Sequence, residues 1–145
     1  MDENIELLEY IYKNSEMGVY TLKTLLKNLN DKGNKIKKLV DDEMKEYNIF
    51  QDKAKKIIKK NKYELNGNGL MAKIGSSMGI KKEVNKDNSD SSIAHMITEG
   101  ITMGIVDMET KLKNYKDTVS KDIYNLGKDF LKFQQGEVEK LKEFM

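Results

Sequence analysis

Cysteine is absent from the 145 residues, and its absence excludes a broad range of chemistry. Without a thiol there is no disulfide, no thiolate nucleophile, no zinc–thiolate cluster and no iron–sulfur centre. Proline is absent as well, so no helix is interrupted by a residue with a fixed φ angle. The single histidine, His95, excludes any site that needs two imidazoles from one chain.

Long apolar runs and a one-sided charge are also lacking. No segment approaches the roughly 18 consecutive apolar residues of a transmembrane helix, and the acidic start at Asp2 and Glu3 does not resemble a secretion signal. We therefore expect a cytoplasmic protein without a membrane span. The 26 basic and 24 acidic side chains are mixed along the sequence, whereas nucleic-acid binding usually needs a basic excess on one side. We expect no nucleic-acid partner.

What the sequence does contain is helical periodicity. Apolar residues recur in steps of three and four over about 4–30, 35–62, 91–115 and 120–145, the pattern of helices that pack lengthwise. The four apolar rows are Ile5, Leu8, Tyr12, Ser15, Val19, Leu22, Leu26 and Leu29; Ile36, Val40, Glu43, Tyr47, Phe50, Ala54 and Ile57; Ile97, Ile101, Ile105, Met108 and Leu112; and Ile123, Leu126, Phe130, Phe133, Leu141 and Phe144.

The links between these segments predict the topology. Gly33 lies in a short link and is suited to the left-handed conformation of a helix end. Residues 88–92 are rich in side chains that cap helix N-termini. The middle link, 63–90, is long, with an Asn-Gly-Asn-Gly turn signal at 66–69 and a short glycine-containing helix over 70–84. We predict an all-α single domain over 1–145, an antiparallel four-helix bundle whose hairpins 4–62 and 91–145 are joined by this crossover.

Two features link the sequence to a known superfamily. Residues 17–31 align without gaps on residues 103–117, so the two hairpins look related. Residues 39–47 (Leu-Val-Asp-Asp-Glu-Met-Lys-Glu-Tyr) resemble the second-helix signature of rubrerythrin-like proteins. The whole pattern resembles the ferritin-like superfamily that includes rubrerythrin and bacterioferritin, and the first hairpin resembles small bacterial ferritin-like domains of unknown function.

That resemblance implies a site for two iron or manganese ions. It requires one Glu from each of two helices and a Glu-x-x-His from each of the other two. Carried onto this sequence, Glu16 and Glu43 match, but Glu46 stands in the first histidine position, and Gln135 and Val138 stand where the second Glu and His are expected. Both histidines are therefore missing. The candidate ligands that remain, for a rearranged carboxylate site, are Glu16, Glu43, Glu46, Glu99 and Glu137.

Each of these residues also has a simpler interpretation. Glu43 interrupts an apolar row and is explained equally well by a hydrogen bond to Tyr12, Tyr20 or Tyr47. His95, one helical turn before Glu99, is typical of an exposed residue near a helix start. The nine methionines are expected to fill gaps in the core.

Two further segments bear on partners. The 70–84 helix is interpreted as a crossover element packed on the bundle or a partner-binding segment, and less well as a membrane-surface helix. Gly100 and Gly104 are spaced to let another helix approach closely.

The sequence thus favours a non-catalytic ferritin-like protein with a degenerate metal site and no cofactor. It would act as an interaction or structural protein, through a protein partner or as a homodimer. The alternative is an iron- or manganese-binding or redox protein with a rearranged carboxylate site. A weaker alternative is a peripheral membrane or stress-associated protein.

Overall fold

The computed structural model describes residues 2–64 and 69–145, except for the side chain of Leu70. Within these ranges the chain is helical and contains no strand, which confirms the all-α class. Residues 66–68 of the predicted turn signal over 66–69 lie outside the described residues. The elements are α1 (Glu3–Asn28), α2 (Lys37–Lys60), α3 (Leu70–Lys86), α4 (Asp90–Tyr115), α5 (Lys121–Leu141) and a short 3-10 helix, η1 (Lys142–Phe144).

Local chemistry explains where several helices begin and end. Ser89 caps α4 by accepting a hydrogen bond from the Ser92 N–H at 3.2 Å, as the polar run 88–92 predicts. After α2, Lys62 takes a left-handed conformation with φ of 55°, and the Tyr63 N–H returns to the Ile58 carbonyl at 3.0 Å. The expectation for Gly33 was wrong, because no described glycine has a positive φ.

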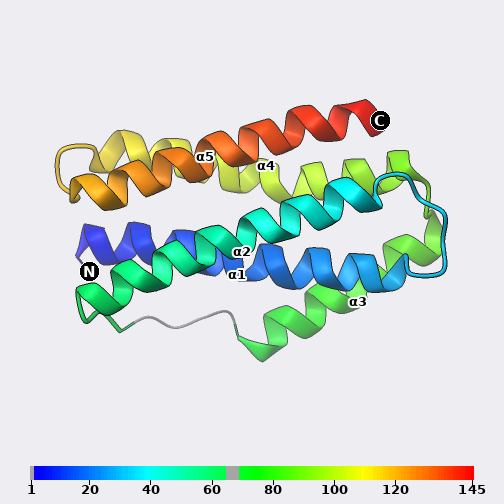
Figure 1. Cartoon of the computed structure of the whole chain (residues 1–145), viewed down its shortest axis with the longest axis horizontal. Helices are drawn as coiled ribbons and strands as arrows, with labels where there is room; N and C mark the ends of the chain where they lie inside the picture. The colour runs from blue at the N-terminus through cyan, green and yellow to red at the C-terminus, as the bar shows by residue number, and fades with distance from the viewer. Residues whose placement is uncertain (1, 65–68) are drawn as a thin grey trace.

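The helices lie side by side along one long axis (Figure 1). α1 and α2 are antiparallel neighbours, and so are α4 and α5. α3 packs along α1 and leads the chain back, so that α4 runs in the same direction as α2. α1 contacts every other α-helix, which places it at the centre of the packing.

Side chains tie the turns at both ends of the molecule to neighbouring helix starts. Asp90, at the start of α4, accepts hydrogen bonds from the Asn34 side chain at 2.8 Å and the Ile36 N–H at 3.4 Å. At the opposite end, Asn4 of α1 accepts one from the Ser120 N–H at 2.7 Å. These contacts set the position of one helix pair relative to the other along the long axis.

The core contains most of the predicted apolar rows. In α2 every predicted row member inside the helix is buried except Ile57, which is partly buried. In α1 the prediction was too narrow, since Leu7, Ile11 and Leu25 are also buried. The reason is that α1 packs against helices on several sides, which needs a wider apolar stripe than a two-helix contact does.

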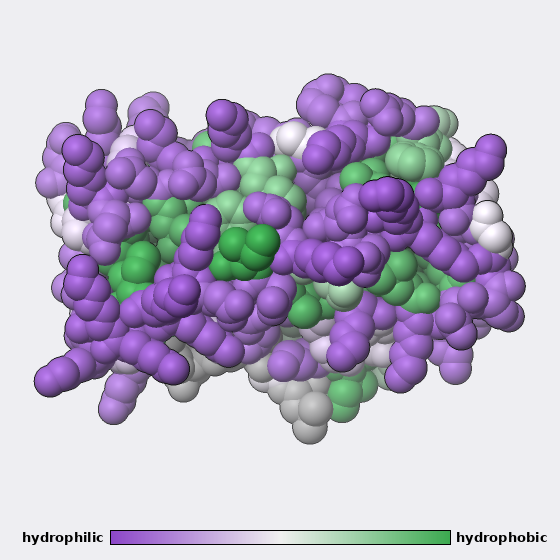
Figure 2. All heavy atoms as spheres, in the orientation of Figure 1, coloured by the Kyte–Doolittle hydropathy of each residue, from purple (hydrophilic) through white to green (hydrophobic). Residues whose placement is uncertain are grey.

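α3 differs from the other helices. Among its described side chains Ile80 and Val84 are buried, whereas Met71, Ile74 and Met78 are exposed, so the predicted apolar side of this helix was only partly right. Polar side chains cover most of the face seen in Figure 2, with apolar side chains showing between them. Among the described residues, no helix has the length and apolarity needed to cross a membrane.

Candidate functional site

Two glutamates meet in the middle of the core. Glu43 comes from α2 and Glu137 from α5, and their exposed fractions are 3% and 2%. Each continues the apolar row of its helix: Glu43 lies one turn before Tyr47, and Glu137 lies between Phe130 and Leu141 at helical spacing. Packing of the two rows against each other therefore forces both carboxyl groups into the interior. Buried carboxyls are rare unless they have partners.

A hydrogen-bond network surrounds the pair. Tyr47 donates its hydroxyl to Glu137 Oε2 at 2.9 Å. Gln134, one turn before Glu137 and fully buried, donates its amide to the Tyr47 oxygen at 3.2 Å and to Asn14 Oδ1 of α1 at 3.4 Å. Three helices thus contribute to one polar cluster, which we call the Glu43–Glu137 cluster.

Gly18 of α1 makes room for this network. A Cβ atom there would lie 2.7 Å from carbons of the Tyr47 ring, closer than atoms can approach. The ring therefore lies directly against the α1 backbone, and its hydroxyl is positioned to reach Glu137. Tyr47 also belongs to an aromatic group with Phe50, Phe130 and Phe133, in which its ring centroid is 4.9 Å from that of Phe133.

Burial controls the protonation of the cluster. Desolvation, followed by the hydrogen bond and charge of Glu137, raises the pKa of Glu43 far above its usual range. Desolvation also raises the pKa of Glu137, although hydrogen bonds from Glu43 and Tyr47 oppose that rise. Burial likewise raises the pKa of Tyr47, which stays a neutral donor. The pair therefore retains one proton at neutral pH, with Glu43 as the acid that donates to Glu137.

The cluster has more acceptors than donors. Four of its oxygens, Glu43 Oε1 and Oε2, Glu137 Oε1 and Gln134 Oε1, are fully shielded and have no donor among the described side chains when both glutamates are ionised. One shared proton satisfies an oxygen on each glutamate. The remaining oxygens are still without a donor among the described side chains.

The structure brings together only two of the five predicted metal ligands. Glu16 is half-buried on α1, with Oε1 3.9 Å from the Lys73 ammonium of α3, and Glu46 is half-buried on α2. Glu99 is exposed on α4, as is His95. Over residues 2–64 and 69–145, no three His, Asp or Glu side chains are grouped as metal ligands. The residues present therefore do not fit a pair of metal ions, which needs four or more carboxylates and two imidazoles.

Sequence reasoning missed part of this cluster. It assigned Glu43 a tyrosine partner, and Tyr47 is adjacent, but the tyrosine donates to Glu137 instead. It considered Gln135, which is exposed, and overlooked the buried Gln134. The signal was present, because Phe130, Gln134, Glu137 and Leu141 continue the α5 row in steps of four and three. The roles of Asn14 and Gly18 depend on which helix lies opposite, which periodicity alone does not specify.

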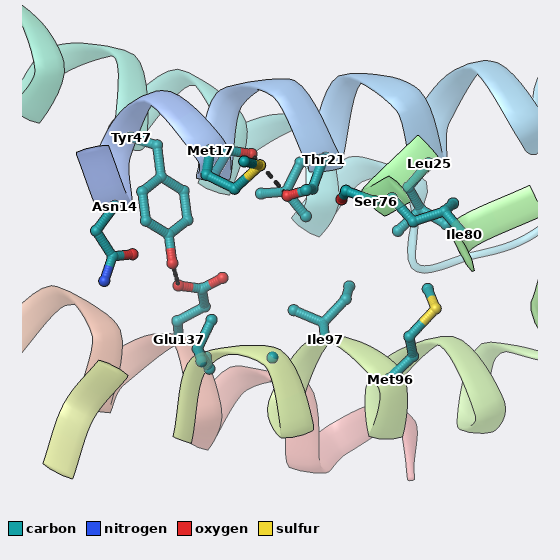
Figure 3. Close-up of a pocket in the computed structure, with 14 residues that line it drawn as sticks. Asn14, Met17, Thr21, Leu25, Tyr47, Ser76, Ile80, Met96, Ile97 and Glu137 are labelled. Atoms are coloured by element: carbon teal, nitrogen blue, oxygen red, sulfur yellow. Dashed lines mark hydrogen bonds between the residues drawn. The ribbon is translucent and has the colours of Figure 1, made fainter. Parts of the chain in front are cut away.

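A cavity of about 260 Å³ adjoins the cluster. Figure 3 shows its two ends: Asn14, Tyr47 and Glu137 lie at one end, and Leu25, Ile80 and Met96 lie at the other. All five α-helices contribute to its wall, which is lined by Asn14, Met17, Gly18, Thr21, Leu22, Leu25, Tyr47, Ser76, Ile80, Met96, Ile97, Gly100, Ile101 and Glu137. The cavity is therefore polar at one end and largely apolar along its length.

Comparisons with protein-family models, with curated proteins and with solved structures give no match for this chain. The features that bear on function are therefore the Glu43–Glu137 cluster and its cavity.

Proposed function

We propose that this chain is a non-catalytic ferritin-like four-helix bundle with a degenerate metal site, acting as an interaction or structural protein. Support for the ferritin-like arrangement comes from the two antiparallel neighbours α1–α2 and α4–α5, and from α3, which leads the chain back between them. Glu43 and Glu137 occupy the second and fourth of the long helices, where the resemblance calls for a Glu-x-x-His.

The observation that carries the proposal is how the two buried glutamates are satisfied. They share a hydrogen bond with each other, and Tyr47 donates to Glu137. A proton and a phenol hydroxyl here replace the positive charge that metal ions would supply. The other three candidate ligands lie elsewhere, Glu99 on the surface and Glu16 near Lys73. Two carboxylates are fewer than iron or manganese sites of this superfamily use.

A second candidate is binding of a single iron or manganese ion, as a metal-binding or redox protein. It is favoured by the surplus of buried oxygens: when both glutamates are ionised, Glu43, Glu137 and Gln134 together offer four without a donor among the described side chains. Oxygen donors of this kind suit manganese better than soft metals. A bound ion would displace the proton shared by the glutamates.

Metal analysis separates the two candidates. The protein is purified without chelators, then offered Fe(II) under air or Mn(II), and its metal content is measured after desalting. We expect far less than one ion per chain, with the same content in Glu43→Gln and in the control Glu46→Gln, which removes a charge from the same helix outside the cluster. One ion per chain that is lost in Glu43→Gln and kept in Glu46→Gln would establish the metal protein instead.

The proposed partner is a second copy of this chain. Large apolar side chains are exposed on α3 and α4: Met71 is 80% exposed, Met78 68% and Met103 69%. Such residues are common at surfaces that pair with another protein. Sedimentation over a wide concentration range should show a homodimer that Met103→Lys or Met78→Lys weakens. A monomer at every concentration would contradict this part of the proposal.

A further inference from the structure

The cavity beside the Glu43–Glu137 cluster is large enough for a small organic molecule. An apolar protein cavity of about 150 Å³ accommodates benzene, so the volume of about 260 Å³ corresponds to roughly ten non-hydrogen atoms. The cavity is partly open to solvent, since Gly100 of its wall is exposed and Met17 and Met96 are only half-buried. A ligand of this size can therefore enter it.

The wall dictates the shape of that ligand. Met96 and Ile97 project from α4 toward α1, and Leu25 and Ile80 close the far end (Figure 3). These side chains offer only dispersion and hydrophobic contact, which suits an alkyl or aryl group. Glu137, Tyr47 and Asn14 lie together at the other end, and the hydroxyl groups of Thr21 and Ser76 lie along the wall between the two ends. A matching ligand has one polar head and one apolar tail.

Two hydrogen-bond donors near Glu137, the Tyr47 hydroxyl and the Gln134 amide, already have acceptors. Tyr47 gives its hydroxyl to Glu137, and Gln134 gives its amide to Tyr47 and Asn14. Apart from the proton shared with Glu43, the second oxygen of Glu137, Oε1, has no donor among the described side chains, and it is turned toward the cavity in Figure 3. A ligand head must therefore donate hydrogen bonds. A carboxylate head in this position would be repelled by the carboxyl group of Glu137.

We propose that this cavity binds a primary amine with an apolar tail, its ammonium group on Glu137 and its tail between Met17, Met96 and Ile97. An ammonium group carries three donors and no acceptor, which complements the surplus of oxygens. The site rests on the proposed function in one respect, because a metal ion on Glu137 would occupy the place of the ammonium group.

Four probes of graded chemistry test the assignment. n-Octylamine carries both features, 1-octanol keeps the tail with a neutral head, octanoate reverses the charge, and n-butylamine shortens the tail. Binding is followed by the NMR signals of labelled methionine methyl groups. Met17 and Met96 line the cavity, whereas Met71 and Met103 are exposed and serve as internal references.

The expected result is saturable shifts of Met17 and Met96 with octylamine, leaving Met71 and Met103 unchanged. Octanol and butylamine should bind at least tenfold more weakly, and octanoate not at all. Equal binding of octylamine and octanoate, shifts spread over all four methionines, or no shift with octylamine would overturn the proposal.

Two variants locate the binding. Glu137→Gln should weaken octylamine at least tenfold while leaving octanol nearly unchanged. Gly100→Leu, which adds a side chain to the cavity wall, should weaken both, whereas Gly75→Leu on the exposed part of α3 is the matched control. Full octylamine affinity in Gly100→Leu would also overturn the assignment.

Metal content is measured on the same samples. One ion per chain would refute the proposed function, whereas metal-poor protein that does not bind the amine would refute this inference alone.

Discussion

The two sides of the Glu43–Glu137 cluster are built differently. Toward α2 and α5, the interior is filled by aromatic rings: Phe50 and Phe130 lie 5.1 Å apart between ring centroids, and Phe133 stacks beside them. Toward α1, α3 and α4, the same cluster faces a cavity of about 260 Å³ lined by smaller or flexible side chains. The Glu43–Glu137 cluster thus lies between an aromatic region of the core and a cavity.

The difference separates the part of the core that contributes most to stability from the part that would hold the proposed amine. Large buried rings supply both hydrophobic burial and edge-to-face contacts, so the α2–α5 contact stabilises the fold. α3 buries Ile80 and Val84 and leaves its other large described side chains largely exposed, so it contributes less. We therefore expect α3 to separate from α1 locally at a smaller free-energy cost than α2 from α5.

The largest expected effect comes from a substitution in the aromatic region. Phe130→Ala removes a fully buried ring there and should lower the free energy of unfolding by about 3–5 kcal/mol. Ile80→Ala, at the cavity wall, should lower it by only about 2 kcal/mol, because some of its neighbours are already missing. Urea unfolding followed by circular dichroism measures both. Equal losses of unfolding free energy in the two variants would contradict the difference between the aromatic region and the cavity wall.

Glu43→Gln tests the Glu43–Glu137 cluster, which lies between the aromatic region and the cavity. The folded protein raises the pKa of Glu43 from about 4.5 to about 10, by burial first and then by Glu137, with Asp42 adding and Lys140 opposing. A raised carboxyl pKa favours the folded state below pH 4.5, and that contribution is lost as the pH rises toward 10, at about 1.4 kcal/mol per pH unit. A neutral amide avoids this loss, so the variant should be more stable by up to about 3 kcal/mol at pH 7.

The measurement is unfolding free energy against pH for wild type and variant. Their difference should grow steadily from pH 5 to pH 9. Glu46→Gln, on the same helix but outside the cluster, should follow the wild-type curve. A Glu43→Gln protein that is less stable than wild type at pH 8 would show that the pair is not held together by a proton.

Gly18→Ala sharpens the comparison at Tyr47. The added methyl group would lie 2.7 Å from the ring, so the ring or α1 must shift, which we expect to lower stability by about 1–3 kcal/mol. Gly136→Ala on α5 meets no atom within 4 Å and should instead stabilise its helix by about 0.5–1 kcal/mol. Thermal unfolding of both variants checks the signs. A stabilised Gly18→Ala protein would show that Tyr47 does not lie against α1.

The smallest effect concerns the outer face of α3. The double variant Met71→Ser and Met78→Ser changes two exposed side chains and should alter the unfolding free energy by less than about 0.5 kcal/mol. Chemical denaturation at low protein concentration provides the value. A loss near 2 kcal/mol would mean that these methionines pack in the folded protein.

Much of this fold is predictable from the sequence, for identifiable reasons. The α2 row is recovered because this helix has one interior side, so apolar spacing and burial coincide. The α1 row is incomplete because this helix is surrounded, and α3 is ambiguous because its apolar residues do not share one face. Glu43 stands out as a polar residue in an apolar row.

The cluster itself is less predictable. Glu137 occupies an equivalent row position and was named only as a metal ligand. That the two glutamates face each other, and that Gly18 lies against Tyr47, depends on how the helices slide and rotate. Sequence periodicity does not carry that information. The cavity depends on it even more, because side chains from all five α-helices define it.

The central claim is that a shared proton satisfies the buried glutamate pair. Carbon-13 NMR of the side-chain carboxyl groups of Glu43 and Glu137, recorded from pH 3 to pH 10, observes that proton directly. At pH 7 we expect the chemical shift of the Glu43 carboxyl carbon to be that of a protonated acid, and the shift of Glu137 to be that of an ionised one. Two fully ionised carboxylates at pH 7 would contradict it.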